Sequence, residues 1–442
     1  MHPKPEIPPI DTIVAPATPM GRSALAIVRI DGPESAAILT GLSGAAVPEP
    51  RVATFTRLAE LDECVAIRYV APHSFTGNDL VELTLHGNPL LVERVLEACI
   101  SLGARMAEPG EFTERAVLNG KLDLVQAESI ADLINARTPL QAKLSLSNLG
   151  GILSRKAAAV RETLLHVISR LEAALDFSEE GYEFISRDEA RAQLTGALAD
   201  VRLLAQSYRR GRATTAGLSA VILGRPNAGK STLLNRLVGS DRAIVTPIPG
   251  TTRDIVRETI EIGGLPVTLA DTAGLRDSAD VVEGIGIARA REAAATADVI
   301  LYLVDASSGI TEEDRRELAV LEDVLLIYTK ADLAAAPMDQ LSISVVSEHG
   351  IGELLRRLDA VVRERFAAPE GSAVVVNERQ RAAVGECEAA LEAALEALDA
   401  QFDEQMILVD LHRAAGALGL LIGAITREEI YTEIFSKFCI GK

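Results

Sequence analysis

The spacing of apolar residues changes several times along this chain of 442 residues. Residues 1–118 contain short β-like runs (SALAIVRI, VAIRYV and DLVELTLHG) and one helical stretch (PLLVERVLEACISLG), separated by Gly and Pro. This mixture predicts a compact α+β domain. From Leu122 to about residue 214, apolar residues recur at helical spacing with few breakers, which predicts helices alone.

At Leu218 the pattern changes to apolar runs that are each followed by a loop and a helical stretch. The runs LSAVILG, LPVTLADTAG, DVILYLVDAS and VLLIYTKAD predict a parallel α/β sheet within residues 215–375. Helical spacing then returns over 376–442. We therefore predict a multidomain α/β protein whose sheet-containing domain is inserted into one helical domain, formed by 119–214 and 376–442. The sequence leaves open whether the two helical parts pack together.

Composition narrows the class of protein. Hydrophobic residues make up 48% of the chain but aromatic residues only 3%, which suits helices with narrow apolar faces. The four cysteines, Cys64, Cys99, Cys387 and Cys439, have no short spacing, which argues against disulfides or a zinc site and favours a reducing compartment. The N-terminus lacks a signal-peptide pattern, and the apolar stretch Ala414–Ile425 is shorter than the roughly 20 residues of a membrane span. We expect a cytoplasmic protein that does not enter a membrane.

The net charge of −19, from 44 basic and 63 acidic residues, disfavours non-specific coating of nucleic acid and predicts no role on DNA. Any nucleic-acid role would need a local basic patch or a basic partner. The one basic cluster, YRRGR at Tyr208–Arg212, lies where a helix is expected to end. The sequence alone favours a solvated helix terminus for this cluster.

A phosphate-binding loop is predicted at Gly224–Ser231, where GRPNAGKS follows the strand-like run AVIL and opens the helical stretch TLLNRL. Glycines allow successive backbone N–H groups to face phosphates, and the helix N-terminus adds positive potential. Lys230 would reach the β- and γ-phosphates of a nucleotide, and the hydroxyl of Ser231 would bind Mg²⁺.

Four further elements follow in order: PGTTRD with Thr251 and Thr252, DTAG at Asp271–Gly274, TKAD at Thr329–Asp332, and SEHGIG from Ser347. Together with the phosphate-binding loop they resemble the translation-factor-related GTPases of the TrmE-Era-EngA-YihA-Septin class, which implies a Ras-like G domain and bound GTP. The residues expected at the nucleotide are Asn227, Ala228, Gly229, Lys230, Ser231, Thr232, Thr246, Pro247, Ile248, Pro249, Gly250, Thr251, Thr252, Asp271, Thr272, Ala273, Gly274, Thr329, Lys330, Ala331, Asp332, Ser347 and Glu348.

Two positions depart from the pattern of that class. Thr329 stands where asparagine usually contributes to guanine binding, while Asp332 should still favour guanine over adenine. Leu275 follows DTAG where glutamine is usual, and a leucine cannot orient the attacking water. Hydrolysis would therefore need another group for the water.

The whole chain resembles the bacterial tRNA-modification GTPase family MnmE, also called TrmE. The resemblance rests on DTIVAPATPMGRSALAIVRI, HSFTGNDLVELTLHGNP, PGEFTERAVLNGKLDLVQAESIADLI, the nucleotide motifs, GIGIARA and the terminal FCIGK. It implies that the N-terminal domain binds a tetrahydrofolate derivative, in its 5-formyl or 5,10-methylene form, and mediates homodimerisation. The matching folate contacts would be Arg29, Glu82, Lys121 and Lys442.

The resemblance also implies a catalytic device for GTP hydrolysis. K⁺ would be held by Asn227, Thr246, Ile248 and Thr251 when two G domains meet, and Mg²⁺ by Ser231 and Thr252. A cation at this position neutralises developing charge between phosphates, as an arginine finger does. Glu283 matches the carboxylate that orients the water, which would replace the glutamine absent at Leu275.

Cys439, in the terminal FCIGK, allows three interpretations. A lipidation signal is excluded because Gly441 is not aliphatic and Lys442 is not a usual final residue. The resemblance implies a cysteine near the folate of a dimer, where a thiolate could act as nucleophile or acid–base group. A buried structural cysteine is the alternative, and Cys64, Cys99 and Cys387 are expected to be inert.

The resemblance implies a K⁺-stimulated GTPase that works with MnmG, a partner that uses FAD and NADH, in a heterotetramer or larger complex. The pair would add an aminomethyl or carboxymethylaminomethyl group to carbon 5 of the wobble uridine in certain tRNAs. Most of the tRNA affinity should lie on the partner or on the complex, given the acidic charge of this chain. Two alternatives remain: a GTP-switched ribosome-assembly factor, and a folate-dependent one-carbon transferase that does not act on RNA.

Overall fold

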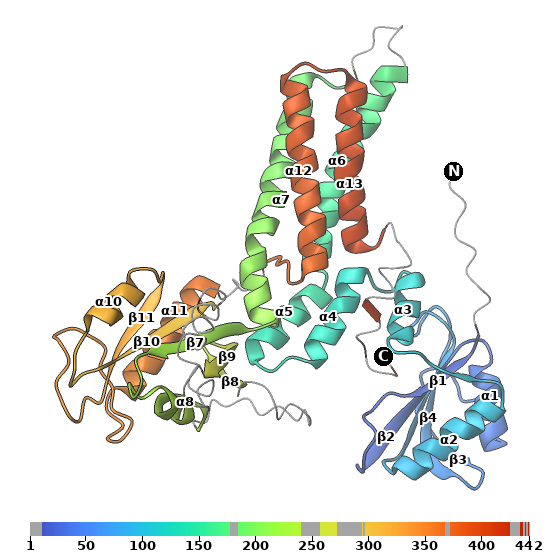
Figure 1. Cartoon of the computed structure of the whole chain (residues 1–442). Helices are drawn as coiled ribbons and strands as arrows, with labels where there is room; N and C mark the ends of the chain where they lie inside the picture. Colours follow the sequence, from blue (N-terminus) through green and yellow to red (C-terminus); the bar gives the residue numbers. More distant parts are fainter. Residues whose placement is uncertain are drawn as a thin grey trace, which may run out of the picture. The chain divides into compact units, whose positions relative to one another are not determined.

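The structure is a computed structural model that describes residues 11–176, 184–239, 257–271, 294, 297–366, 372–424, 434–435, 438 and 441 (Figure 1). The chain divides into two compact units, Met1–Ala131 with Gly416–Lys442 and Asp132–Ala415. Each unit is described by itself. The finer division at residues 118, 214 and 375 stays a prediction.

The first unit contains a six-stranded sheet in the order β3-β4-β5-β2-β1-β6. Its strands are antiparallel except for the pair β1 and β6. They are β1 (Ile13–Pro16), β2 (Leu25–Asp31), β3 (Thr54–Leu58), β4 (Asp62–Tyr69), β5 (Leu80–His86) and β6 (Arg105–Met106). The β-like runs of the sequence form β2, β4 and β5, as predicted.

Helices α1 (Ser35–Ser43) and α2 (Pro89–Ser101) share a buried core with this sheet. The side chain of Asn88 accepts a hydrogen bond from the N–H of Leu90, and Pro89 occupies the first turn, so the start of α2 is set locally. A third helix, α3 (Glu111–Leu118), precedes the predicted folate residue Lys121. The predicted α+β character of this region is confirmed.

The C-terminal segment belongs to the first unit. Phe435 and Phe438 have ring centroids 5.5 Å apart and join a buried cluster with Leu124 of α4 (Leu124–Ile134). Gly441 has a φ of +95°, and a Cβ at this residue would overlap the carbonyl oxygen of Pro16. Glycine is therefore required where the chain end passes β1.

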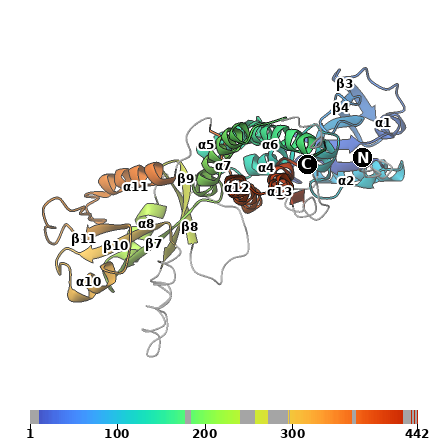
Figure 2. The same ribbon diagram turned by 90° about the horizontal axis from the view of Figure 1, so that it is seen from above.

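The second unit contains the helices α5 (Pro139–Leu149), α6 (Ile152–Asp176), α7 (Arg187–Thr215) and α12 (Glu378–Asp399), with most of α13 (Glu404–Ile422). Helices α7 and α12 lie side by side (Figures 1 and 2). Arg202 of α7 forms an ion pair of 2.6 Å with Glu392 of α12. The helical parts before and after the sheet therefore pack together, which confirms the predicted insertion.

The basic cluster lies near the end of α7, where Arg209 and Arg210 are exposed, as expected for a solvated helix terminus, but several of its side chains also have partners elsewhere in the fold. The helix continues to Thr215, the hydroxyl of Tyr208 donates to Glu378 at 2.6 Å, and Arg212 forms an ion pair with Asp298 at 3.1 Å. The guanidinium of Arg209 lies over the ring of Phe366, 5.2 Å from its centroid. These partners lie far away in the sequence, which is why local spacing did not reveal them.

The second unit also contains a five-stranded sheet in the order β11-β10-β7-β9-β8. Strands β7 (Leu218–Gly224), β9 (Leu265–Asp271), β10 (Val299–Asp305) and β11 (Val324–Thr329) are parallel, and β8 (Arg257–Ile262) is an antiparallel edge. Buried residues of α8 (Lys230–Val238) and α11 (Ile351–Phe366) cover one face. The other face packs against α10 (Glu312–Leu318), and Figure 2 shows α10 and α11 on opposite sides of the sheet. The predicted α/β block is confirmed.

Among the described helices, α13 is long and apolar enough to cross a membrane, although half of its most apolar 18-residue stretch is buried inside the structure. Arg413 of α13 forms an ion pair of 2.6 Å with Glu386 of α12, and His412 lies 3.1 Å from Glu172 of α6. A core helix passes the same test of length and apolarity, so α13 is weak evidence for a membrane span.

Candidate functional site

The phosphate-binding loop connects β7 to α8, as predicted. Asn227 and Gly229 have φ values of +64° and +89°, the left-handed backbone that occurs in anion-binding loops. At Gly224 a Cβ would overlap the carbonyl oxygen of Leu303 on the neighbouring strand, so only glycine fits there. The loop therefore has the backbone geometry of an anion-binding site.

Lys230, the first residue of α8, is almost completely buried. Its Nζ donates hydrogen bonds to the carbonyl oxygens of Gly224 and Arg225, each at 2.8 Å. The ammonium group thus lies within the loop that is expected to hold phosphates. Ser231 and Thr232 follow in the exposed first turn of α8, which is compatible with a hydroxyl ligand for Mg²⁺.

Strand register brings the separate nucleotide motifs to one edge of the sheet. Ile222 of β7 is paired with Asp271 of β9, and Leu303 of β10 is paired with Gly224. Asp305 at the end of β10 is paired with Thr329 at the end of β11. The carboxyl ends of four parallel strands therefore surround the phosphate-binding loop, which is where ligands bind in such sheets.

Thr329 links the predicted base-reading motif to the phosphate-binding loop. Its buried hydroxyl donates to the carbonyl oxygen of Ala228 at 2.8 Å and lies 3.3 Å from that of Val304. The next residue, Lys330, has a φ of +58° and forms an ion pair of 2.7 Å with Asp305. Burial raises the pKa of Asp305, but hydrogen bonds from Lys330 and Ser307 outweigh it and keep that pKa below its usual value.

The remaining parts of the base-reading region lie close by. The N–H of Ala331 donates a hydrogen bond to the carbonyl oxygen of Ile343 at 3.1 Å. Asp332, the next residue, is exposed. Ser347 and Glu348 are exposed in the next loop, where Glu348 has a φ of +57° and pairs with Arg236 of α8 at 2.9 Å. The described members of the predicted nucleotide set thus gather around α8 and the ends of β7, β9 and β11.

Replacing Thr329 by valine tests the link between the two loops. Valine keeps the shape of threonine but leaves the carbonyl of Ala228 without its hydroxyl donor, which we expect to cost about 1 to 3 kcal/mol. Thermal unfolding and titration with GTP should show a less stable second unit and weaker nucleotide binding. Thr259→Val is the control, because the hydroxyl of Thr259 on β8 contacts that of Thr268 on β9 at 3.2 Å and none of the described loop residues. Equal GTP affinity in the two variants would contradict a role for Thr329 in shaping the site.

Several predicted residues lie outside the described part of the chain. They are Thr246, Pro247, Ile248, Pro249, Gly250, Thr251, Thr252, Thr272, Ala273, Gly274, Glu283, Cys439 and Lys442, and for Asp271 only the backbone is described. Their roles stay predictions.

A pocket of about 430 Å³ in the first unit contains three of the four predicted folate residues, Arg29, Glu82 and Lys121. Arg29 on β2 is paired in register with Glu82 on β5, and their side chains form an ion pair of 2.8 Å. The guanidinium of Arg29 also lies over the ring of Phe75, 5.3 Å from its centroid. Carboxylate, guanidinium and aromatic face together suit a planar heterocycle with N–H donors.

Sequence reasoning missed the other residues that line this pocket, which are Arg51, Tyr69, His73, Ser74, Phe75 and Leu80. The hydroxyl of Tyr69 donates to Glu82 at 3.3 Å, and Arg51 donates to the carbonyl of His73 at 3.1 Å. The exposed aromatic residue in the polar loop HSFTGND was the signal that could have revealed Phe75. Arg51 could not be found locally, because only the strand order brings it to the pocket.

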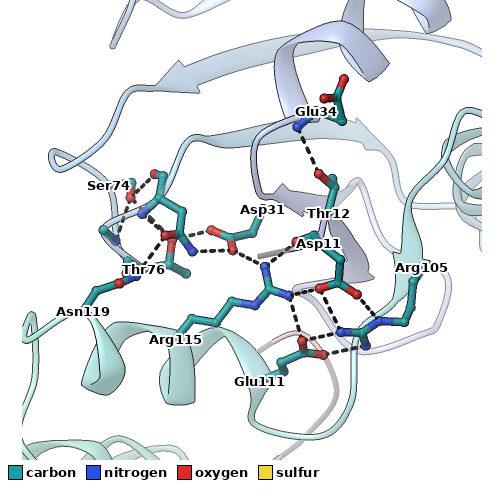
Figure 3. A network of polar contacts seen from close by, with 12 residues as sticks. Asp11, Thr12, Asp31, Glu34, Ser74, Thr76, Arg105, Glu111, Arg115 and Asn119 are labelled. Atoms are coloured by element: carbon teal, nitrogen blue, oxygen red, sulfur yellow. Dashed lines mark hydrogen bonds and ion pairs between the residues drawn. The ribbon is translucent and has the colours of Figure 1, made fainter. Parts of the chain in front are cut away.

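A buried network holds the loop that carries Phe75 (Figure 3). Asp31 at the end of β2 is fully buried and accepts hydrogen bonds from the hydroxyl of Thr76 and from Asn78, the latter at 3.0 Å. Arg115 of α3 donates to the same carboxylate at 2.9 Å. Asn119 donates to the carbonyl of Thr76 at 2.7 Å. One carboxylate therefore ties the pocket loop to α3, shortly before Lys121.

The network continues to the surface through Asp11, Arg105 and Glu111 (Figure 3). A hydrogen bond from Arg105 holds the pKa of Asp11 below its usual value. Burial raises the pKa of Glu111. Hydrogen bonds from Arg105 and from the N–H of Glu108 outweigh this effect, so the pKa of Glu111 is below its usual value. Their contribution to stability is present at neutral pH and is lost as the pH falls through these lowered values.

The three described cysteines carry no reactive thiol. Cys64, Cys99 and Cys387 are buried, and burial raises the pKa of each thiol to about 12. A thiolate is therefore scarce at neutral pH, in keeping with the expectation that these residues are inert. Within the described ranges no group of three or more His, Cys, Asp or Glu side chains could hold a metal ion.

Comparison with known proteins matches two family models, "GTP-binding protein TrmE N-terminus" over residues 12–121 and "MnmE helical domain" over residues 124–439. The tRNA modification GTPase MnmE of Koribacter versatilis is 41% identical, with 98% of this chain and 99% of that protein covered. That of Aquifex aeolicus is 39% identical, with 98% and 100% covered. A solved structure of an Era variant from Aquifex aeolicus, bound to GDP and AlF4⁻, is 25% identical over 39% of this chain and 66% of that chain, with a TM-score of 0.27.

Proposed function

This chain belongs to the tRNA modification GTPase MnmE family, and we propose that it is a K⁺-stimulated GTPase that modifies tRNA together with MnmG. The reaction adds an aminomethyl or carboxymethylaminomethyl group to carbon 5 of the wobble uridine in certain tRNAs. The observation that carries this proposal is the presence, in one chain, of a phosphate-binding loop at a parallel sheet edge and a separate pocket lined by Arg29, Glu82 and Lys121.

At the nucleotide site, Lys230 and the backbone N–H groups of the loop bind the phosphates of GTP, and Ser231 with Thr252 holds Mg²⁺. Asn227, Thr246, Ile248 and Thr251 hold K⁺, which neutralises charge that develops during hydrolysis. Glu283 orients the attacking water. Asp332 accepts hydrogen bonds from guanine, while Thr329 supports the loop through Ala228.

At the second pocket, Glu82 accepts hydrogen bonds from the heterocycle of a tetrahydrofolate derivative, and Arg29, Lys121 and Lys442 bind its acidic tail. This cofactor supplies the one-carbon unit. Cys439 acts as nucleophile or acid–base group near the folate across the dimer. Glu82 is held by Arg29 and Tyr69, and Arg29 lies over the ring of Phe75, so little ordering of these two side chains is needed on binding.

The proposed working assembly is a cytoplasmic homodimer joined to MnmG, which brings FAD and NADH, in a heterotetramer or larger complex that binds tRNA. GTP hydrolysis drives the G domains together and apart and so controls the modification. The domains proposed for these roles are residues 1–118 for folate and dimerisation, 215–375 for GTP, and 119–214 with 376–442 for the helical domain.

Nucleoside mass spectrometry of tRNA tests the proposal in cells that lack the gene. Complementation with the wild type should restore the modified wobble uridine, whereas Arg29→Gln should not, because it breaks the ion pair with Glu82. Arg57→Gln is the matched control, since its ion pair with Glu63 lies on the exposed part of the same sheet. Cys439→Ser should also fail to restore the modification.

The outcomes separate the proposal from its alternatives. Unchanged uridines in the deletion strain would remove the tRNA function and favour a ribosome-assembly factor. Binding of a tetrahydrofolate derivative by the purified chain with no change in tRNA nucleosides would favour a one-carbon transferase. Restoration by Cys439→Ser would keep the function and return this cysteine to a structural role.

A further inference from the structure

A second large hollow, of about 940 Å³, lies in the second unit between α6, α7, α11 and the segment 372–374. None of the residues that line it belongs to the nucleotide motifs. Five basic side chains and a single acidic one line it: Arg155, Lys156, Arg209, Arg210, Arg365 and Asp200. Such a concentration of positive charge is unexpected in a chain with a net charge of −19.

Segment 372–374, which forms one wall, is anchored on both sides. The N–H of Val375 donates to the hydroxyl of Ser207 at 3.0 Å, and Asn148 of α5 donates to the carbonyl of Val374 at 3.3 Å. At Gly211 a Cβ would overlap the carbonyl of Val375, so α7 and this segment are in direct backbone contact. The hollow is therefore a built feature of the fold.

Only two of the five cations are neutralised by carboxylates. Lys156 pairs with Asp200 at 2.7 Å, and Arg365 pairs with Asp323 at 3.0 Å. Arg155 donates to the uncharged carbonyl of Gly150, and Arg209 lies over the ring of Phe366. Arg155, Arg209 and Arg210 thus have no carboxylate partner among the residues that the structure describes, and three positive charges remain at the hollow.

The positive charge that lines this hollow favours an anionic occupant. Guanidinium groups bind phosphate oxygens through two parallel hydrogen bonds, and the hollow lies at the upper end of the size range of small-molecule pockets. Leu203 and Ala159, whose side chains are exposed, add apolar surface that can contact sugars or bases. A polyanion with repeated phosphates satisfies both the charge and the apolar contact.

We propose that this hollow binds the phosphate backbone of tRNA. The inference rests on the proposed function, which requires an RNA substrate. It also explains how an acidic chain contacts RNA at all: the cations are gathered in one place while the rest of the surface repels nucleic acid. The contact contributes to binding and leaves most of the affinity to the assembled complex.

The test measures binding of fluorescently labelled tRNA to the full chain by anisotropy, over a range of KCl concentrations starting near 50 mM. A double variant with Arg155→Gln and Arg210→Gln should have a dissociation constant for tRNA about tenfold higher than the wild type at the lowest salt concentration. The slope of log affinity against log salt should fall by about 0.7 to 0.9 for each phosphate that the variant no longer neutralises. Neither arginine pairs with a described carboxylate, so the variant should fold normally.

The control removes the same charge elsewhere on the second unit. Arg316→Gln with Arg356→Gln changes two exposed arginines on α10 and α11, at 79% and 77% side-chain exposure, and should leave the affinity and its slope unchanged. The proposal would be overturned by equal losses of tRNA affinity in both double variants, by unchanged tRNA binding in the Arg155 and Arg210 variant, or by a wild type that does not bind tRNA. It would also be overturned if the Arg155 and Arg210 variant lost binding to labelled poly-glutamate but kept its binding to tRNA, because the hollow would then bind an acidic peptide. Failure of the proposed function would be seen instead in the tRNA nucleosides of the deletion strain, with the anisotropy results unaffected.

Discussion

Replacing Lys230 by alanine should lower GTP hydrolysis at least about 100-fold. The ammonium group is buried within the phosphate-binding loop, where it hydrogen-bonds the carbonyl oxygens of Gly224 and Arg225. Removing one preorganised group that stabilises developing charge typically costs a factor of 100 to 1,000 in rate. Release of inorganic phosphate from GTP in KCl, measured with saturating nucleotide, reports this loss directly.

Lys143→Ala is the matched control for charge. Lys143 is exposed on α5 of the same unit, so its loss should leave hydrolysis within a factor of two or so of the wild type. Circular dichroism should show that both variants keep their helices. A Lys230→Ala variant that hydrolyses GTP as fast as the Lys143→Ala variant would remove Lys230 from the phosphate site.

The second large effect is expected from Asp31→Ala in the first unit. The change leaves Asn78 and one nitrogen of Arg115 without their buried acceptor, while Arg115 keeps its other partners, Asp11 and Glu111. Breaking a buried pair by removing one partner costs about 3 to 5 kcal/mol. Hydrogen exchange of the amides in β2 and β5 should therefore become at least about 100-fold faster, since these strands open with the unit.

Glu63→Ala provides the comparison on the same sheet. Glu63 pairs with Arg57 at an exposed position, where an ion pair contributes at most about 1 kcal/mol. Exchange in β2 and β5 should barely change in this variant. If Asp31→Ala exchanged at the same rate as Glu63→Ala, the network around Asp31 would not hold the first unit together. Because Asp31 also ties down the loop that carries Phe75, the Asp31→Ala variant should bind tetrahydrofolate derivatives more weakly as well.

Features that depend on consecutive residues could be predicted from the sequence. The phosphate-binding loop at Gly224–Ser231 is one example, because a tight turn, a lysine and a helix start must follow each other within eight residues. The strands β2, β4 and β5 and the helix α2 are others, since their apolar spacing and the Asn88–Pro89 start are local. The resemblance to one family also placed Arg29, Glu82 and Lys121 together before any geometry was known.

Features that depend on contacts between distant residues were decided by the tertiary structure. The register of β2 with β5 creates the Arg29–Glu82 pair, and the strand order adds Arg51 to the same pocket. The hydroxyl of Thr329 meets Ala228 only because parallel strands end at one edge. The partners of the cluster from Tyr208 to Arg212 could not be predicted from the sequence for the same reason. Its partners Glu378, Phe366 and Asp298 lie 86 or more residues away, and local spacing carries no information about which charges and rings the fold will place opposite one another.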